Sequence, residues 1–262
     1  MLVLLVAGAT AAVGQGQADG QQTAPPAAEG SLTAKAPLPP PGFMRMCLQL
    51  IEQRRYADAR RMLEPIVADH PGWPRAHFYL ALSYHKQNRY AKARELYERT
   101  LQLDPAYHSA KPFYGWCLYY LGELARSREL FEAYLAERPG YPDAIFALGL
   151  IDFDEDLIDS ARTHFIEAAR LAGERGDRST EAKSRARLAD VHVRAGELEK
   201  ARLELQHSVE LNPDNYETYF KLSRVLQRLG DTEGAEQARL KHVEVRKRMR
   251  PEAGTEPPAE GP

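Results

Sequence analysis

A pattern that returns every 34 residues limits the fold of this 262-residue chain more than any other feature. Pro71, Pro105 and Pro139 mark the interval. Each proline follows a small residue by twelve positions and a bulky residue by eight; these are Ala59, Ala93 and Ser127, then Leu63, Tyr97 and Phe131. A unit this short cannot bury its own apolar face, so successive units must stack against one another.

Each repeat contains two segments of about 14 residues in which apolar residues recur at i, i+3, i+4 and i+7, the spacing of an amphipathic helix. Short polar turns separate the two segments, and several carry glycine or asparagine, as at Asn88, Gly122 and Gly196. These residue types suit a helix C-terminus where the backbone takes a positive φ angle. The sequence therefore predicts antiparallel helix pairs.

The interval, the terminal proline and the large–small pairs such as Leu80-Ala81 together resemble the tetratricopeptide repeat family over residues 40–249. The resemblance implies an all-α fold, a right-handed α-solenoid of antiparallel helix pairs. We expect six repeats, at about residues 40–73, 74–107, 108–141, 142–175, 182–215 and 216–249. Residues 176–181 break the register, and we expect a longer turn there in which Ser179 or Thr180 caps the next helix.

The ends of the chain differ in composition from the repeats. Residues 1–14 are apolar and small, which is typical of a secretory signal peptide, although the usual basic n-region is missing, since no Lys or Arg precedes Leu2. We expect an exported protein, periplasmic or secreted, or a cytoplasmic one if this segment is not a signal. Residues 15–39 are rich in Pro, Gln and Ala and predict a disordered linker, and residues 250–262 predict a disordered tail.

Charge and motif content exclude several function classes. Lys+Arg 35 against Asp+Glu 37 argues against a nucleic-acid coat, and no apolar run reaches the roughly 18 residues of a membrane span. Two cysteines exclude a disulfide scaffold, and no two of the 8 histidines have zinc-site spacing. Asp152, Asp154 and Asp156 alternate as in a calcium loop, but Leu157 and Thr163 replace its Gly and Glu. We predict no enzyme, no metal site and no cofactor.

The resemblance also implies a binding surface, because in this family the first helix of each pair lines a concave groove. The implied inward positions are aromatic and apolar in the early repeats and cationic in the last two. They comprise Phe78, Leu82, Trp116, Tyr119, Tyr120, Phe146, Leu150 and Phe153, followed by Arg194, Arg224 and Arg228. The alternative is that several of these residues pack between helices. Met44 and Leu48 stand where chaperone-binding members carry Lys and Asn, which argues against a carboxylate clamp.

These observations favour a non-catalytic adaptor that binds a protein or peptide partner in the groove. A structural subunit or self-assembling scaffold of a larger envelope complex, including a homo-oligomer, is the alternative. A third hypothesis concerns the basic run at residues 239–250, which could contact anionic lipid or nucleic acid. The simpler interpretation of that run is a solvated last turn whose cations complement the helix dipole.

Overall fold

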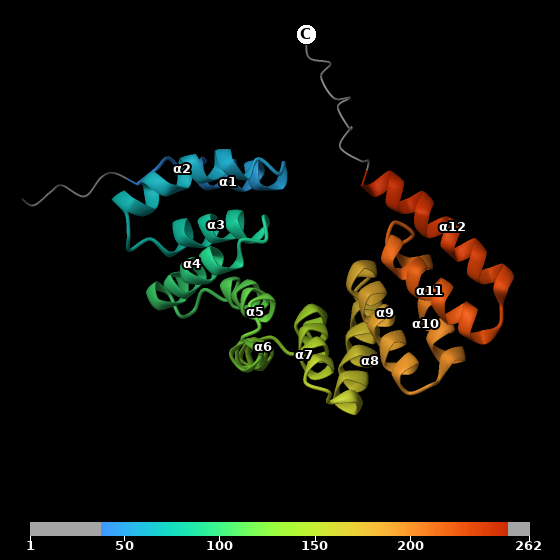
Figure 1. Cartoon of the computed structure of the whole chain (residues 1–262). Coiled ribbons are helices and arrows are strands. Elements are labelled where there is room, and N and C mark those ends of the chain that lie inside the picture. Colours follow the sequence, from blue (N-terminus) through green and yellow to red (C-terminus); the bar gives the residue numbers. More distant parts are fainter. Residues whose placement is uncertain (1–37, 251–262) are drawn as a thin grey trace, which may run out of the picture. The chain divides into compact units, whose positions relative to one another are not determined.

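The computed structural model describes residues 38–250, which form twelve α-helices and no strand (Figure 1). All of these residues belong to one compact unit. The predicted signal peptide, nearly all of the predicted linker and the tail beyond residue 250 lie outside the described residues. Among the helices described, none is both long and apolar enough to cross a membrane.

The helices follow one another as antiparallel pairs, two for each predicted repeat. In chain order they are α1 (Phe43–Glu52), α2 (Tyr56–Asp69), α3 (Pro74–His85), α4 (Tyr90–Leu103), α5 (Ala110–Tyr120), α6 (Leu124–Glu137), α7 (Pro142–Asp154), α8 (Ile158–Glu174), α9 (Arg178–Arg194), α10 (Leu198–Leu211), α11 (Tyr216–Leu229) and α12 (Thr232–Met249). The predicted all-α solenoid is therefore confirmed.

The expected longer turn between the fourth and fifth repeats is wrong in its extent. Helix α9 begins at Arg178, and its N-cap is Asp177, whose carboxylate accepts a hydrogen bond from the backbone N–H of Thr180 at 3.1 Å. Ser179 and Thr180 therefore lie inside the first turn of the helix instead of capping it. The Asp177 side chain, two residues before Ser179, satisfies one of the free N–H groups of the first turn, and the helix therefore starts sooner.

Pairs of small and bulky residues hold neighbouring helices together. Gly149 of α7 faces Phe165 of α8, and a Cβ atom at Gly149 would lie only 2.7 Å from the ring. Phe165 is itself fully buried. The same arrangement places Gly115 against Phe131 in the preceding repeat. Small residues let the helices approach closely, and the bulky residue fills the remaining space, as the repeat pattern predicts.

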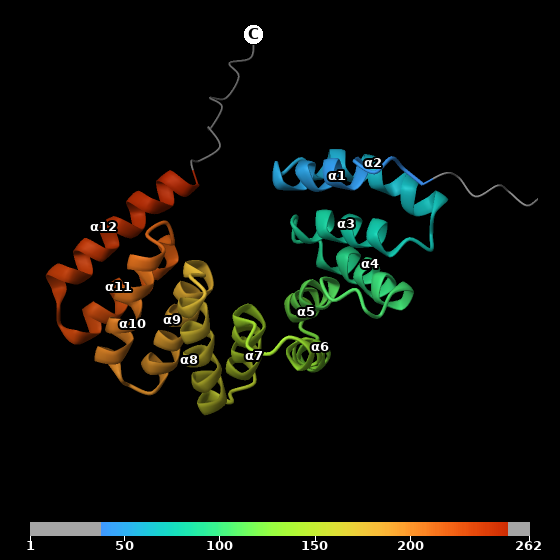
Figure 2. The ribbon, with the colours of Figure 1, turned by 180° about the vertical axis from the view of Figure 1, so that it is seen from behind.

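The odd-numbered helices lie along the inner side of an arc, and the even-numbered helices lie outside them (Figures 1 and 2). Contacts between α1 and α3, α3 and α5, α5 and α7, and α7 and α9 connect the inner helices directly. The first helix of each pair therefore lines the concave side. This arrangement brings residues from distant repeats to one surface.

Candidate functional site

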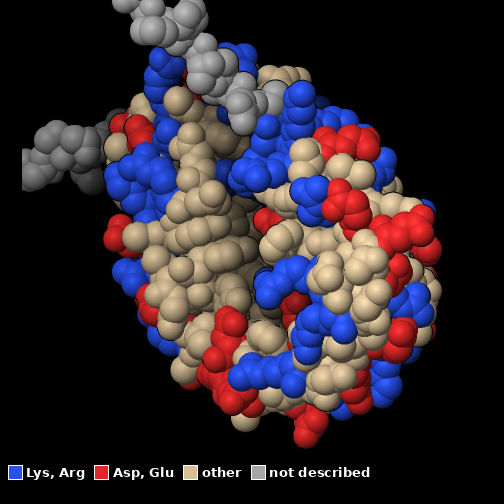
Figure 3. Space-filling view, turned by 45° about the vertical axis from the view of Figure 1, so that its right-hand side comes forward, with Lys and Arg blue, Asp and Glu red and all other residues tan. Residues whose placement is uncertain are grey.

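The concave side contains a groove of about 600 Å³ to which five inner helices or their ends contribute. Its lining combines aromatic, apolar and charged side chains from the second to the sixth repeat. The lining residues are His85, Lys86, Trp116, Tyr120, Asp143, Phe146, Leu150, Lys183, Ala186, Arg187, Asn215, Glu217, Thr218 and Lys221. Figure 3 looks toward this hollow, with Lys and Arg along one side and a largely uncharged surface on the other.

Stacked aromatic rings form one wall of the groove. Tyr120 stacks on Tyr90 with ring centroids 4.5 Å apart and on Trp116 at 5.9 Å, while 53% of its surface stays exposed. The Trp116 indole Nε1 donates a hydrogen bond to Asp143 Oδ2 at 2.9 Å. Because stacking and this hydrogen bond fix both rings, they present apolar surface to the groove in a defined orientation.

Four of the predicted groove residues meet in this wall. Phe146 and Leu150 of α7 are buried beneath the aromatic wall and line the floor of the groove, next to Trp116 and Tyr120. Phe146 also packs against Trp116, with ring centroids 6.2 Å apart. The two buried side chains therefore support the aromatic wall more than they offer surface of their own.

Tyr119 and Phe153 lie outside the lining of the groove and are partly buried at its edge. The Tyr119 hydroxyl donates a hydrogen bond to Asp154 at 2.8 Å, and the Arg194 guanidinium lies 5.6 Å from the centre of the Phe153 ring. Arg194 also forms an ion pair with Asp156 at 2.7 Å. These side chains connect neighbouring repeats.

Phe78 and Leu82 are not groove residues. Each is only 7% exposed, and Phe78 packs against Tyr97 at 5.8 Å, Tyr107 at 5.1 Å and Phe113 at 5.9 Å. Tyr107, in the connection between α4 and α5, helps to cover α3. The two residues therefore belong to the hydrophobic core of the first three repeats, which is the alternative that the sequence left open.

The predicted cations Arg224 and Arg228 line a smaller pocket of about 160 Å³ that adjoins the groove through Lys221. Arg224 lies 5.9 Å from the centre of the Phe220 ring. Among residues 38–250, no carboxylate forms an ion pair with either arginine. Arg224 and Arg228 thus lie beside the groove, whereas Arg194, the third predicted cation, pairs with Asp156 outside its lining.

Sequence reasoning missed Lys86, Arg187 and Lys221 as lining residues. Lys221 and Arg187 both approach Asp190, at 2.6 and 3.4 Å. A helical-face count could have found the last two: Arg187 follows Lys183 by four positions, and Lys221 precedes Arg224 by three. Lys86 follows the end of α3 and lines the groove together with residues of later repeats.

Burial keeps the groove's histidine uncharged near neutral pH. Burial lowers the pKa of His85 to about 4, and its Nδ1 lies 3.2 Å from the Cys117 thiol. Burial also raises the pKa of Cys117 to about 12 and that of Cys47 to about 11. Both cysteines are therefore protonated, buried thiols and poor nucleophiles.

Asp152, the first of the three alternating aspartates, is buried and bound by side chains of the protein. It is 1% exposed, accepts hydrogen bonds from Ser160 at 2.5 Å and His164 at 2.7 Å, and pairs with Arg128 at 2.7 Å. Burial raises its pKa, but these hydrogen bonds outweigh burial and hold the pKa below its usual value. The part of the chain described here contains no group of three side chains suited to hold a metal.

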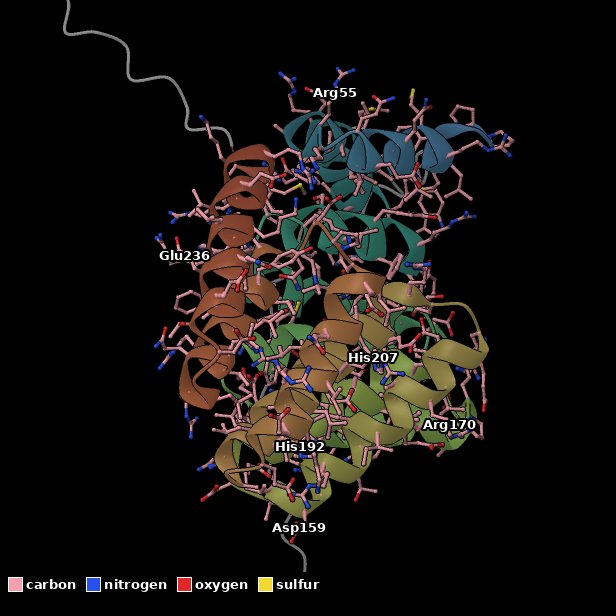
Figure 4. The ribbon with its side chains drawn as sticks, turned by 90° about the vertical axis from the view of Figure 1, so that its right-hand side faces the viewer. Arg55, Asp159, Arg170, His192, His207 and Glu236 are labelled. Carbon is pink, nitrogen blue, oxygen red and sulfur yellow. The ribbon has the colours of Figure 1, made fainter. Side chains whose placement is uncertain are left out.

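Many charged side chains on the surface pair within their own helices. Figure 4 shows Arg170 of α8 and Glu236 of α12 on opposite sides of the molecule in this view. Arg170 pairs with Glu167 and Glu174 on α8, and Glu236 pairs with Arg239 on α12. These short-range pairs are typical of solvated helix surfaces and add little stability.

Family models of the tetratricopeptide repeat match residues 48–108, 182–215 and 204–237. The chain is a tetratricopeptide repeat protein. A search of the curated proteins gives no significant match to the sequence.

Solved structures agree with this tetratricopeptide repeat fold. The APC/C hetero-tetramer Cut9-Hcn1 matches with a TM-score of 0.69 at 17% identity, over 78% of this chain but only 39% of the other. PilF of Pseudomonas aeruginosa matches with a TM-score of 0.64 at 18% identity, over 81% and 92%. MamA matches with a TM-score of 0.53 at 17% identity, over 66% and 98%. At these identities the likeness concerns the fold alone.

Proposed function

We propose that this protein is a non-catalytic adaptor that binds a segment of a partner protein in its concave groove. Tetratricopeptide repeat proteins act as protein-interaction modules. The observation that supports the proposal most strongly is the exposed ring of Tyr120, held between Tyr90 and Trp116 at the mouth of a groove of about 600 Å³. Anchoring side chains that are already ordered lose little conformational entropy on binding, and aromatic anchors dominate interface energies.

Photocrosslinking in living cells tests this proposal. A photoreactive phenylalanine analogue replaces Tyr120 in one variant and Ile166 in another; Ile166 is 50% exposed on α8, among the outer helices. We expect position 120 to crosslink to a partner protein and position 166 to give no such product. Equal crosslinking from both positions, or crosslinking from position 166 alone, would contradict a groove-based adaptor.

Fractionation of the same cells tests the export that we propose from residues 1–14. We expect the protein outside the cytoplasm and shortened at its N-terminus. Full-length protein in the cytoplasmic fraction alone would argue that the segment is not a signal.

A self-assembling scaffold has one supporting observation of its own. Leu240 and Val243, three residues apart on α12, are 58% and 52% exposed on the last helix that the structure describes. Light scattering over a range of concentrations distinguishes this function. A mass that rises with concentration, and that Leu240→Glu returns to the monomer value, would favour the scaffold over the adaptor.

A further inference from the structure

We infer that the segment bound by the groove is acidic next to its apolar anchors, and that its carboxylates lie against α9 and α11. This inference rests on the proposed function and adds the chemistry of the partner to it. It follows from the charges of the lining, from which of those charges are already paired, and from where they stand relative to the aromatic wall.

The lining of the groove is positive although the chain as a whole is not. The formal net charge of the chain is -2, whereas the groove and its adjoining pocket together contain six Lys or Arg and three Asp or Glu. Charges of one sign gathered in a concave surface reinforce one another's potential, because the protein walls exclude water between them. The groove therefore attracts anions even though the rest of the surface carries a slight excess of acids.

Two of the three acids already have partners inside the protein. Asp143 accepts the indole hydrogen bond of Trp116, and Asp190 pairs with Lys221. Most of the cations lack such a partner: within residues 38–250, no carboxylate forms an ion pair with Lys86, Lys183, Arg224 or Arg228. Four cations without an ion-pair partner in the described part of the chain therefore line the groove and its adjoining pocket, where the partner is proposed to bind.

The cations and the aromatic rings occupy different helices. Trp116 and Tyr120 belong to α5, whereas Lys183 belongs to α9 and Arg224 to α11. A bound segment that touches both must carry apolar side chains toward α5 and α7 and carboxylates toward α9 and α11. The inferred carboxylates are acidic side chains along the segment, spaced to reach the cations of both α9 and α11.

Selection from a random peptide library tests the inference. The probe is a displayed library of 16-residue peptides with both ends fused, so that no free carboxyl terminus is present, selected on the full chain. We expect the selected peptides to be enriched in Asp and Glu and in Trp, Phe and Leu relative to the input. Binding of individual selected peptides should weaken steeply as salt is raised, because ion pairs near a protein surface are screened.

Charge-reversal variants test whether the cations of α9 and α11 cause the preference for acidic peptides. Selection on Lys183→Glu with Arg224→Glu should lose the acidic enrichment and keep the aromatic one, and selected acidic peptides should bind this variant at least roughly tenfold more weakly. The control is Arg246→Glu with Lys247→Glu on α12, which changes the net charge equally at exposed positions outside the groove lining. The control should select the same peptides as the unchanged protein.

Different results would contradict the acidic partner and the adaptor function. Enriched aromatic peptides without acidic enrichment, or an acidic enrichment that survives reversal of Lys183 and Arg224, would overturn the acidic partner and leave the adaptor function standing. A library that yields no enriched peptides on the full chain would overturn both. Competition by an oligothymidylate as strong as that by selected peptides at the same salt would mean a general anion surface, which also contradicts the inference.

Discussion

Alanine at Gly149 should destabilise the protein although alanine normally favours helices. A Cβ atom there would lie 2.7 Å from Phe165 Cε1, 2.8 Å from Phe165 Cδ1 and 3.1 Å from His164 Cβ. The Phe165 ring is fully buried and packs against Phe146 with centroids 5.8 Å apart, so it has no free space to enter. Overpacking of this kind costs about 1–3 kcal/mol, and with a buried ring in the way we expect this cost to exceed the helix-propensity gain of about 1 kcal/mol.

Gly173 provides a matched control on α8. Its added Cβ atom would meet only the Glu181 carboxylate, with Oε2 at 3.3 Å, and this flexible side-chain end can move away. Replacing glycine by alanine raises helix propensity in both variants, so this gain largely cancels when their free energies of unfolding are compared. The two variants should therefore differ by the steric cost at Gly149, about 1–3 kcal/mol. Urea denaturation followed by circular dichroism measures both free energies of unfolding. A difference below about 0.5 kcal/mol would refute the close packing of α7 on α8.

Three further perturbations test the packing and the charges of the solenoid. Asp152→Ala should lower the free energy of unfolding by about 3 kcal/mol, because it removes the acceptor of Ser160 and His164; a loss below about 1 kcal/mol in urea denaturation would argue against the buried network. Burial lowers the folded-state pKa of His85 from 6.5 to about 4, so the unfolded chain binds the extra proton and stability should fall as pH drops through this window. His85→Phe should reduce this loss of stability at low pH, measured as urea unfolding midpoints at several pH values. The same pH dependence in the variant would mean that other groups cause the loss. Deletion of residues 216–262 should leave the helicity per residue of the first ten helices nearly intact in circular dichroism, whereas loss of all helicity would contradict a solenoid.

The repeat interval was sufficient to predict the helix pairs, because local contacts determine them. Each pair packs through residues at fixed positions, such as Ala93 and Tyr97, which are both fully buried. The start of α9 escaped prediction because Asp177 supplies a cap outside the repeating frame. A single side chain that satisfies free backbone N–H groups can move a helix boundary by several residues.

The groove was harder to predict because it depends on the curvature of the whole array. Phe78 and Phe146 occupy equivalent positions in their repeats, and both are buried, yet only Phe146 lines the groove. The difference arises from neighbours in later helices, such as Tyr107 over Phe78. Lys86 and Lys221 line one groove although 135 residues separate them in the sequence. Each repeat is rotated slightly relative to the one before it, and these rotations add up along a solenoid. The sequence pattern of a single repeat does not give the total rotation.

The central claim is that the aromatic wall of the groove recognises a partner. Paired measurements of peptide affinity and free energy of unfolding for Tyr120→Ala test it most directly, with Ile166→Ala as a control of similar exposure, 50% against 53%. Loss of the stacked ring should cost no more than about 1.5 kcal/mol of stability. Affinity for peptides selected on the unchanged protein should fall at least roughly tenfold for Tyr120→Ala and stay unchanged for Ile166→Ala. Unchanged affinity in Tyr120→Ala, or an equal loss in both variants, would contradict the claim.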